Sequence, residues 1–412
     1  MANKIMSTQL DWRSFLSRVW ITEAGLHLIM RAASAVSSFL LFALVAHYLT
    51  VDDTRQVYFF SFAFGFLVVS LRTYCTITAL LYSDTTRVSK LRKVKIVTHQ
   101  LPWFTILVGI TAIGALSVYG LQWWIVLSAT AMIAICGFDA DLLRAVVGRP
   151  TLFTSAFAVG GLLAIGYLWV MEPSTRDGGC IAFIVQWAPV AIINVKAYVR
   201  LWWRRAQPLR VFTSGTTLSL VGAMLLALYD GAVLNAPFLL SLPMDVGASL
   251  DLSIATRLFL SSLPFLPLMI HWSNVGHIHD MARSHRVAEY AIFGTIIAVT
   301  GVAAGLSFAV LYSVVGTTKV TVLQLGLFAS LLGAYVLYAC MSRYGMCNVS
   351  ARARLVVLGS LLVAFYTILV SMNNTAAHSA AFIVSLQVCA LVIAAAVGWS
   401  GLRAHSRTMH CI

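Results

Sequence analysis

The sequence predicts an all-α, polytopic membrane protein with about 12 transmembrane helices in two six-helix bundles and with both termini in the cytoplasm. Three observations predict this fold class: the composition, the division into apolar runs, and the placement of basic residues. The 412 residues are 60% hydrophobic and 10% charged, with a mean hydropathy of +0.88. An ordinary soluble domain is about a quarter charged, so this chain is unsuited to water.

The apolar runs have the length that a bilayer requires. A spanning helix needs ~20 apolar residues, because lipid offers no hydrogen-bond partner to its backbone. In chain order, the predicted spans cover residues 24–48, 57–82, 101–119, 122–143, 151–171, 180–198, 212–238, 252–272, 288–313, 321–342, 355–371 and 377–399.

The basic residues alternate from one side of the predicted membrane to the other. With the N-terminus inside, 22 of the 28 Lys and Arg residues fall in inner segments, while Arg55, Arg176 and Lys319 fall outside. Positive charge gathers on the cytoplasmic side of membrane proteins, so the net charge of +14 indicates topology and not nucleic-acid binding. This alternation fixes the count of twelve, because losing one span would move every later loop to the wrong side.

The longest basic link between spans, Lys196 to Arg210, follows the sixth run and divides the chain in two. The predicted segments are a cytoplasmic lead at 1–20, a first bundle at 21–199, a basic linker at 200–211, a second bundle at 212–399 and a cytoplasmic tail at 400–412.

Motifs for chemistry are missing from the sequence. The seven cysteines are scattered without paired metal spacing and are expected to be small core residues. The sequence contains no Walker A, G-x-S-x-G, H-E-x-x-H or CxxC motif. We therefore expect no enzyme activity, no cofactor and no metal.

Three arginines lie inside predicted spans: Arg31 in the first, Arg72 in the second and Arg257 in the eighth. A charge near the bilayer centre is costly, so it usually faces a wet cavity or a partner. A guanidinium is permanently charged, and its planar fork suits carboxylate or phosphate oxygens. The alternative is that each arginine is internally paired or reaches an interface, which fits Arg31 best because it lies near a helix start.

Two acids are candidates for ion coupling or for pairing with an arginine. Asp230 lies in the outer half of the seventh span, beside Gly231 and Asn235, and Asp251 begins the eighth. Either acid can pair with Arg257, and Asp230 can instead cap a helix end.

Two segments resemble a known family. Residues 34–70 pass from an apolar helix through the acidic turn YLTVDD into an aromatic-rich helix, and residues 229–270 place an acid before a Gly-led eighth helix. Both resemble polysaccharide-repeat flippases of the multidrug/oligosaccharidyl-lipid/polysaccharide (MOP) superfamily.

That resemblance implies two bundles around a central cavity that opens alternately to either side. The implied substrate is a polyprenyl-pyrophosphate-linked oligosaccharide, flipped across the bacterial inner membrane for assembly of O-antigen, capsule or exopolysaccharide. Membrane lipids, a polysaccharide polymerase and other assembly proteins are the implied partners. The related lipid II flippases place cavity arginines in helices one, two and eight, which are the positions of Arg31, Arg72 and Arg257.

Three other functions remain open. A cation-coupled drug exporter of the same superfamily would need acids in its cavity, whereas three arginines are present here. A major-facilitator transporter also has twelve spans, and residues 83–95 distantly resemble its loop between helices two and three. A membrane scaffold without transport activity is the third.

Overall fold

The computed structural model describes residues 23–81, 152–203, 246–265, 287–315, 319–348 and 380–409, with parts of 109–136 and single positions between 224 and 235. All regular structure within these residues is helical. The first half contains α2 (Glu23–Tyr48), α3 (Val51–Leu81), α5 (Trp123–Cys136), α7 (Leu152–Met171) and α8 (Arg176–Trp203). The second contains α11 (Val246–Ser262), the 3-10 turn η2 (Leu263–Phe265), α13 (Val287–Val315), α14 (Val322–Asn348) and α16 (Ala380–Met409).

These nine α-helices coincide with nine of the predicted spans. Of the remaining three, 101–119 and 212–238 are described only at isolated positions, and 355–371 lies outside the described residues. Five described segments are long and apolar enough to cross a bilayer, namely Ile29–Tyr48, Val51–Leu71, Arg176–Val195, Ala298–Val315 and Ala380–Val397.

Some helices begin earlier than the apolar pattern indicated, because their first turns are polar. Helix α3 begins at Val51 instead of residue 57, where the Thr50 hydroxyl accepts the backbone N–H of Asp53 at 3.3 Å. Acidic residues in a first turn also interact favourably with the helix dipole. A hydropathy scan excludes such turns, although they cap the helix.

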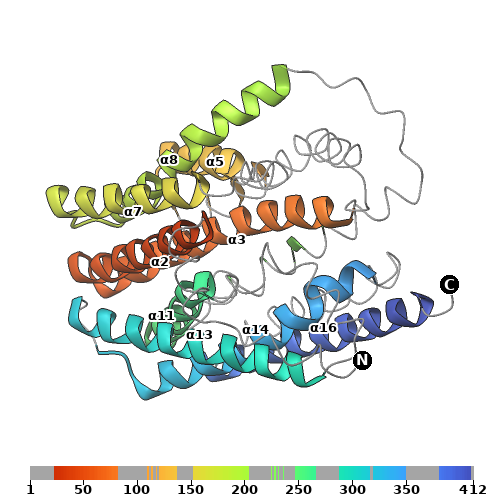
Figure 1. The fold of residues 1–412 in the computed structure, drawn as a ribbon. Coiled ribbons are helices and arrows are strands. Elements are labelled where there is room, and N and C mark those ends of the chain that lie inside the picture. The colour runs from red at the N-terminus through yellow and green to blue at the C-terminus, as the bar shows by residue number, and fades with distance from the viewer. Residues whose placement is uncertain are drawn as a thin grey trace.

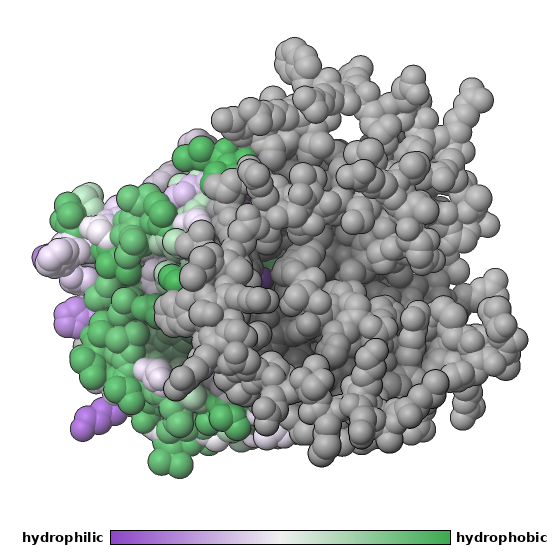
Figure 2. Space-filling model, viewed as in Figure 1, coloured by the Kyte–Doolittle hydropathy of each residue, from purple (hydrophilic) through white to green (hydrophobic). Residues whose placement is uncertain are grey.

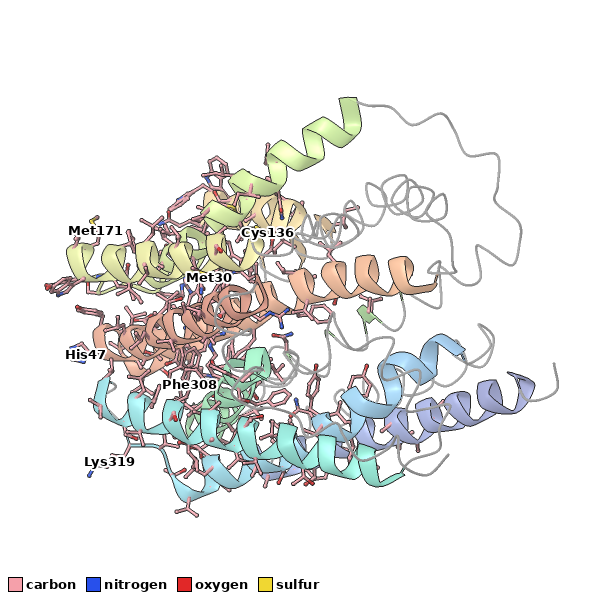
Figure 3. The ribbon with its side chains drawn as sticks, in the orientation of Figure 1. Met30, His47, Cys136, Met171, Phe308 and Lys319 are labelled. Atoms are coloured by element: carbon pink, nitrogen blue, oxygen red, sulfur yellow. The ribbon has the colours of Figure 1, made fainter. Side chains whose placement is uncertain are left out.

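The described links from α2 to α3, from α7 to α8 and from α13 to α14 gather at one end of the molecule. His47, Met171 and Lys319 mark the ends of α2 and α7 and the link from α13 to α14, and all three lie at the left in Figure 3. We call this end the linker end. Arg176 ties it together in the first half, where its guanidinium donates to Oε1 of Gln56 at 2.8 Å and to the Gly120 carbonyl at 3.1 Å. The topology predicted from the basic residues places the linker end on the outer side, and this sidedness stays a prediction.

Helix α7 packs closely on α2 and α8 through two adjacent glycines. A Cβ atom at Gly160 would overlap the carbonyl oxygen of Gln186 on α8, and one at Gly161 would overlap the Ser37 side chain on α2. Small residues let membrane helices approach closely, which supplies the packing contacts that replace the hydrophobic effect in lipid. These three helices lie in the upper half of Figure 1, together with α3 and α5.

The described surface is apolar, as a lipid-facing protein requires. Trp169, Val314 and Val322 are 75%, 77% and 87% exposed. Figure 2 shows hydrophobic side chains over most of the described part of the face that it draws. Apolar exposure on this scale marks a membrane or interaction surface.

The two halves of the chain meet along α2 and α3 on one side and α11 and α13 on the other. Phe39 of α2 lies with its ring centroid 4.8 Å from that of Phe308 on α13, and the Tyr312 ring is 6.0 Å from Phe39. The contact between halves therefore has an aromatic core. The predicted boundaries of the bundles, linker and tail stay predictions, and residues 1–20 lie outside the described part.

Candidate functional site

Arg257 lies where the two halves of the chain meet. From the middle of α11, its Nη2 donates to the carbonyl oxygen of Ser38 on α2 at 3.0 Å and also to the Ser38 hydroxyl. These bonds join residues 219 positions apart in the sequence. The guanidinium is thus held at the interface between halves and does not reach a helix end.

An aromatic ring of α2 lies against the guanidinium, and a second ring from α3 stacks on the first. Its Cζ lies 5.2 Å from the centroid of the Phe42 ring. The Tyr58 ring stacks on Phe42 at 3.5 Å with an interplanar angle of 10°, and the Tyr58 hydroxyl donates to the Phe42 carbonyl at 2.9 Å. Cation–π attraction to a desolvated ring is worth about 2 kcal/mol, so Phe42 offsets part of the cost of burying the charge.

Part of the hydrogen-bonding capacity of Arg257 is unused. Within the described residues, its buried Nε has no hydrogen-bond partner, and its hydrogen bonds come from Nη2 alone. A buried N–H without a partner is rare in folded proteins. Because guanidinium has five donors and no acceptor, the group that would complete this site is an acceptor, preferably an anion.

Arg31 lies on the same face of α2 as Ser38. Seven residues separate them, which is two helical turns, about 10.5 Å along the axis and only ~20° around it. Arg31 is half-buried. Since Arg257 contacts Ser38, the structure places Arg31 and Arg257 on facing helices, with their Cα atoms at different heights.

Arg72 lies on α3, which also contacts α11, but its side chain is outside the described residues. The sharing of one cavity by all three arginines therefore stays a prediction. Close approach of α3 to the seventh span is described nearby, where a Cβ at Gly231 would overlap the Ser70 hydroxyl. Asp230, the neighbour of Gly231, lies outside the described residues.

Asp251 binds a glutamine from another helix. Its Oδ1 accepts a hydrogen bond from Nε2 of Gln324 at 2.7 Å. Gln324 also forms a capping box at the start of α14, because its Oε1 accepts the N–H of Thr321 at 2.9 Å and its own N–H donates to the Thr321 hydroxyl at 3.2 Å. Asp251 thereby attaches α11 to the N-terminus of α14, where a carboxylate is also favoured by the helix dipole.

We expect Asp251→Leu to lower the thermal stability of the purified protein and Asp251→Asn to preserve it. A hydrogen bond to a charged group is worth about 1.5–3 kcal/mol, and an asparagine oxygen can accept the same bond from Gln324. Thermal unfolding in detergent measures both variants, and Gln324→Leu should match Asp251→Leu. If Asp251→Asn unfolds at the wild-type temperature but no longer transports, the carboxylate is an ion-coupling group.

A groove of about 260 Å³ opens at the linker end between α2, α7 and α13. Leu44, His47, Tyr48, Ile165, Trp169 and Val315 line it. Ligand sites usually enclose about 300–1,000 Å³, and none of the three arginines borders this groove. It is therefore separate from the Arg257 site.

Sequence reasoning missed the partners of Arg257. Ser38, Phe42 and Tyr58 are ordinary residues of an apolar helix pair, and no local pattern distinguishes them. One weak signal was present: Ser34, Ser37 and Ser38 form a polar cluster within an otherwise apolar span. Hydroxyls in a membrane helix commonly bond across helices, as Ser38 does here.

Comparison with known proteins identifies the fold. No protein-family profile matches the chain, and no curated protein matches it in sequence. Solved structures do match over nearly the whole length. A MATE transporter in complex with MaD3S has a TM-score of 0.56 at 12% identity, covering 96% of this chain and 97% of its own. An outward-facing multidrug resistance MATE family transporter of the MOP superfamily has a TM-score of 0.55 at 13% identity, covering 95% and 96%.

The Vibrio cholerae MATE transporter VcmN in its bent form has a TM-score of 0.50 at 14% identity, covering 96% of this chain and 98% of its own. At these identities the likeness shows the fold alone. The chain therefore has the twelve-helix membrane fold of these MATE transporters, which confirms the predicted fold class.

Proposed function

We propose that this protein is a transporter that moves a polyprenyl-pyrophosphate-linked oligosaccharide across the bacterial inner membrane for assembly of surface polysaccharide. The observation that carries the proposal is the position of Arg257, a permanently charged group at the interface between the two halves. Alternating-access transporters bind their substrate at the interface between repeated halves, near the middle of the bilayer.

The chemistry of the site favours an anionic head group. A pyrophosphate is compact and rich in acceptor oxygens, and a guanidinium binds such groups with two parallel hydrogen bonds. Among the described residues, Nε of Arg257 has no hydrogen-bond partner, and Arg31 lies on the same face of α2 as Ser38. Arg72 would complete the set if its side chain points to the same interface.

The second candidate is a small-molecule exporter, which the fold likeness to multidrug MATE transporters favours. An exporter of organic cations needs a carboxylate facing its substrate. In the described part of the interface, Arg257 is a charged group in contact with both halves, while Asp251 is bound to Gln324. The local charge therefore supports the flippase over the cation exporter. The fold likeness gives no support to a major-facilitator transporter.

The pool of lipid-linked glycans tests the proposal. Polyprenyl-pyrophosphate glycans would be extracted from cells that lack the protein and from the same cells complemented with the wild type. We expect a completed, unpolymerised repeat unit to accumulate in the deletion and to disappear on complementation. An unchanged pool with intact surface polysaccharide contradicts the flippase. A changed resistance to organic cations in that case would favour the exporter.

A further inference from the structure

Three neighbouring polar groups on α11 are buried and have no hydrogen-bond partner among the residues that the structure describes. They are the Ser253 hydroxyl, the Thr256 hydroxyl and the Nε of Arg257. Ser253 is 1% exposed and Thr256 is 0% exposed. All three fall within five consecutive positions of the helix.

Other hydroxyls of the same helix are satisfied locally. Ser249 donates to the Val246 carbonyl at 2.9 Å, and Ser262 donates to the Phe259 carbonyl at 2.7 Å. Serine and threonine within helices usually make such bonds to the preceding turn. The missing bonds of Ser253 and Thr256 are therefore a property of this part of α11 and not of hydroxyls on α11 in general.

A buried hydroxyl without a partner costs free energy, and three adjacent unsatisfied groups point to a partner from outside the protein. Ser253 is one helical turn from both of the others, at i+3 and i+4, so the three groups are neighbours on the helix surface. The positive charge of Arg257 disfavours a bound cation. An oxygen-rich anion accepts from Nε and from both hydroxyls, which satisfies all three groups.

We propose that Ser253 and Thr256 are part of the substrate site and donate hydrogen bonds to phosphate oxygens that are also bound by Nε of Arg257. This subsite rests on the proposed function, because a diphosphate is the head group of the proposed substrate. The bonds from Arg257 to Ser38 close the interface between α2 and α11 in this structure. Access to the subsite therefore requires these two helices to separate.

Binding of inorganic pyrophosphate to the purified full-length protein in detergent tests the subsite. Isothermal titration calorimetry would compare the wild type with Ser253→Ala and Thr256→Val, and Ser262→Ala serves as the control because its hydroxyl bonds within the helix. We expect about tenfold weaker binding or more for each subsite variant, corresponding to one lost hydrogen bond to a charged group. The control should bind as the wild type does.

Unfolding of the ligand-free protein separates a binding role from a packing role. Removing an unsatisfied buried hydroxyl leaves thermal stability unchanged or raises it, so weaker binding in a stable variant supports the subsite. Thr256→Ser retains the hydroxyl and should retain binding, which guards against a packing defect in Thr256→Val. Wild-type binding by Ser253→Ala and Thr256→Val overturns the subsite.

The two proposals fail in different ways. If Arg257→Ala loses pyrophosphate binding while the two hydroxyl variants bind normally, the subsite is wrong and the proposed function stands. If the wild type itself does not bind pyrophosphate, the subsite and the pyrophosphate substrate fall together.

Discussion

Arg257→Ala is expected to reduce transport at least tenfold while the protein still inserts into the membrane. Hydrogen bonds to a charged group are worth about 1.5–3 kcal/mol, which corresponds to a factor of roughly 10 to 150 in substrate binding. Insertion should survive, because removing a charge from the middle of a span lowers the cost of placing this helix in lipid. The lipid-linked glycan pool measures transport, and the amount of protein in purified membranes measures insertion.

Two further variants give this prediction its controls. Lys319→Ala removes the same charge from an exposed position at the linker end and should transport normally. Arg257→Lys keeps the charge but loses the planar fork, so an intermediate loss is expected if the substrate is bound through two parallel bonds. Full activity of Arg257→Ala at normal expression would contradict a binding role for this arginine. The same test applies to Arg31→Ala and Arg72→Ala.

Gly160→Val is expected to prevent the first half from packing and to remove most of the folded protein. A Cβ at this position would lie 2.8 Å from the Gln186 carbonyl carbon and would overlap its oxygen, so a backbone atom is in the way and cannot rotate aside. Overpacking of a core costs about 1–3 kcal/mol even when side chains can move. Size-exclusion chromatography of the detergent-solubilised protein measures the folded fraction.

Gly166→Ala is the matched control, because it lies on the same helix and has no atom within 4 Å of a Cβ built there. It should keep the wild-type elution profile. Gly160→Ala should fall between the two, since a single methyl group already meets Gln186. A normal profile for Gly160→Val would mean that α7 and α8 are farther apart than the structure places them.

Helix positions could be predicted from the sequence because the bilayer imposes a simple requirement. A segment that crosses lipid must be helical and apolar over ~20 residues, so composition alone locates it. The predicted run 24–48 agrees closely with α2, and 288–313 with α13. Helix starts were predicted less well, as α3 shows, because capping is a polar, local effect that hydropathy does not measure.

The arginine site was predicted only in part. A charge inside an apolar run is visible in the sequence, so Arg31, Arg72 and Arg257 could be selected from 28 basic residues. The partners of Arg257 could not be predicted, because Ser38 is 219 positions away in the sequence. The contact between them depends on how two helices are rotated and at what height they pack. The rotation and height of a membrane helix are set by its packing against neighbouring helices, which the pattern of apolar residues does not specify. Asp251 was a candidate for pairing with Arg257, and the described contact is with Gln324.

The sequence by itself therefore determined that this protein lies in a membrane, where its helices run, and that few charges lie within them. Each of these follows from the free energy of placing one residue type in lipid, which depends on the residue and hardly on its neighbours. Only the tertiary structure decided that Arg257 contacts Ser38 and Phe42 and that Gly160 packs against Gln186. It also decided that two hydroxyls beside Arg257 have no hydrogen-bond partner in the described part of the chain. Such facts depend on distances between helices, which are fixed when the bundle packs.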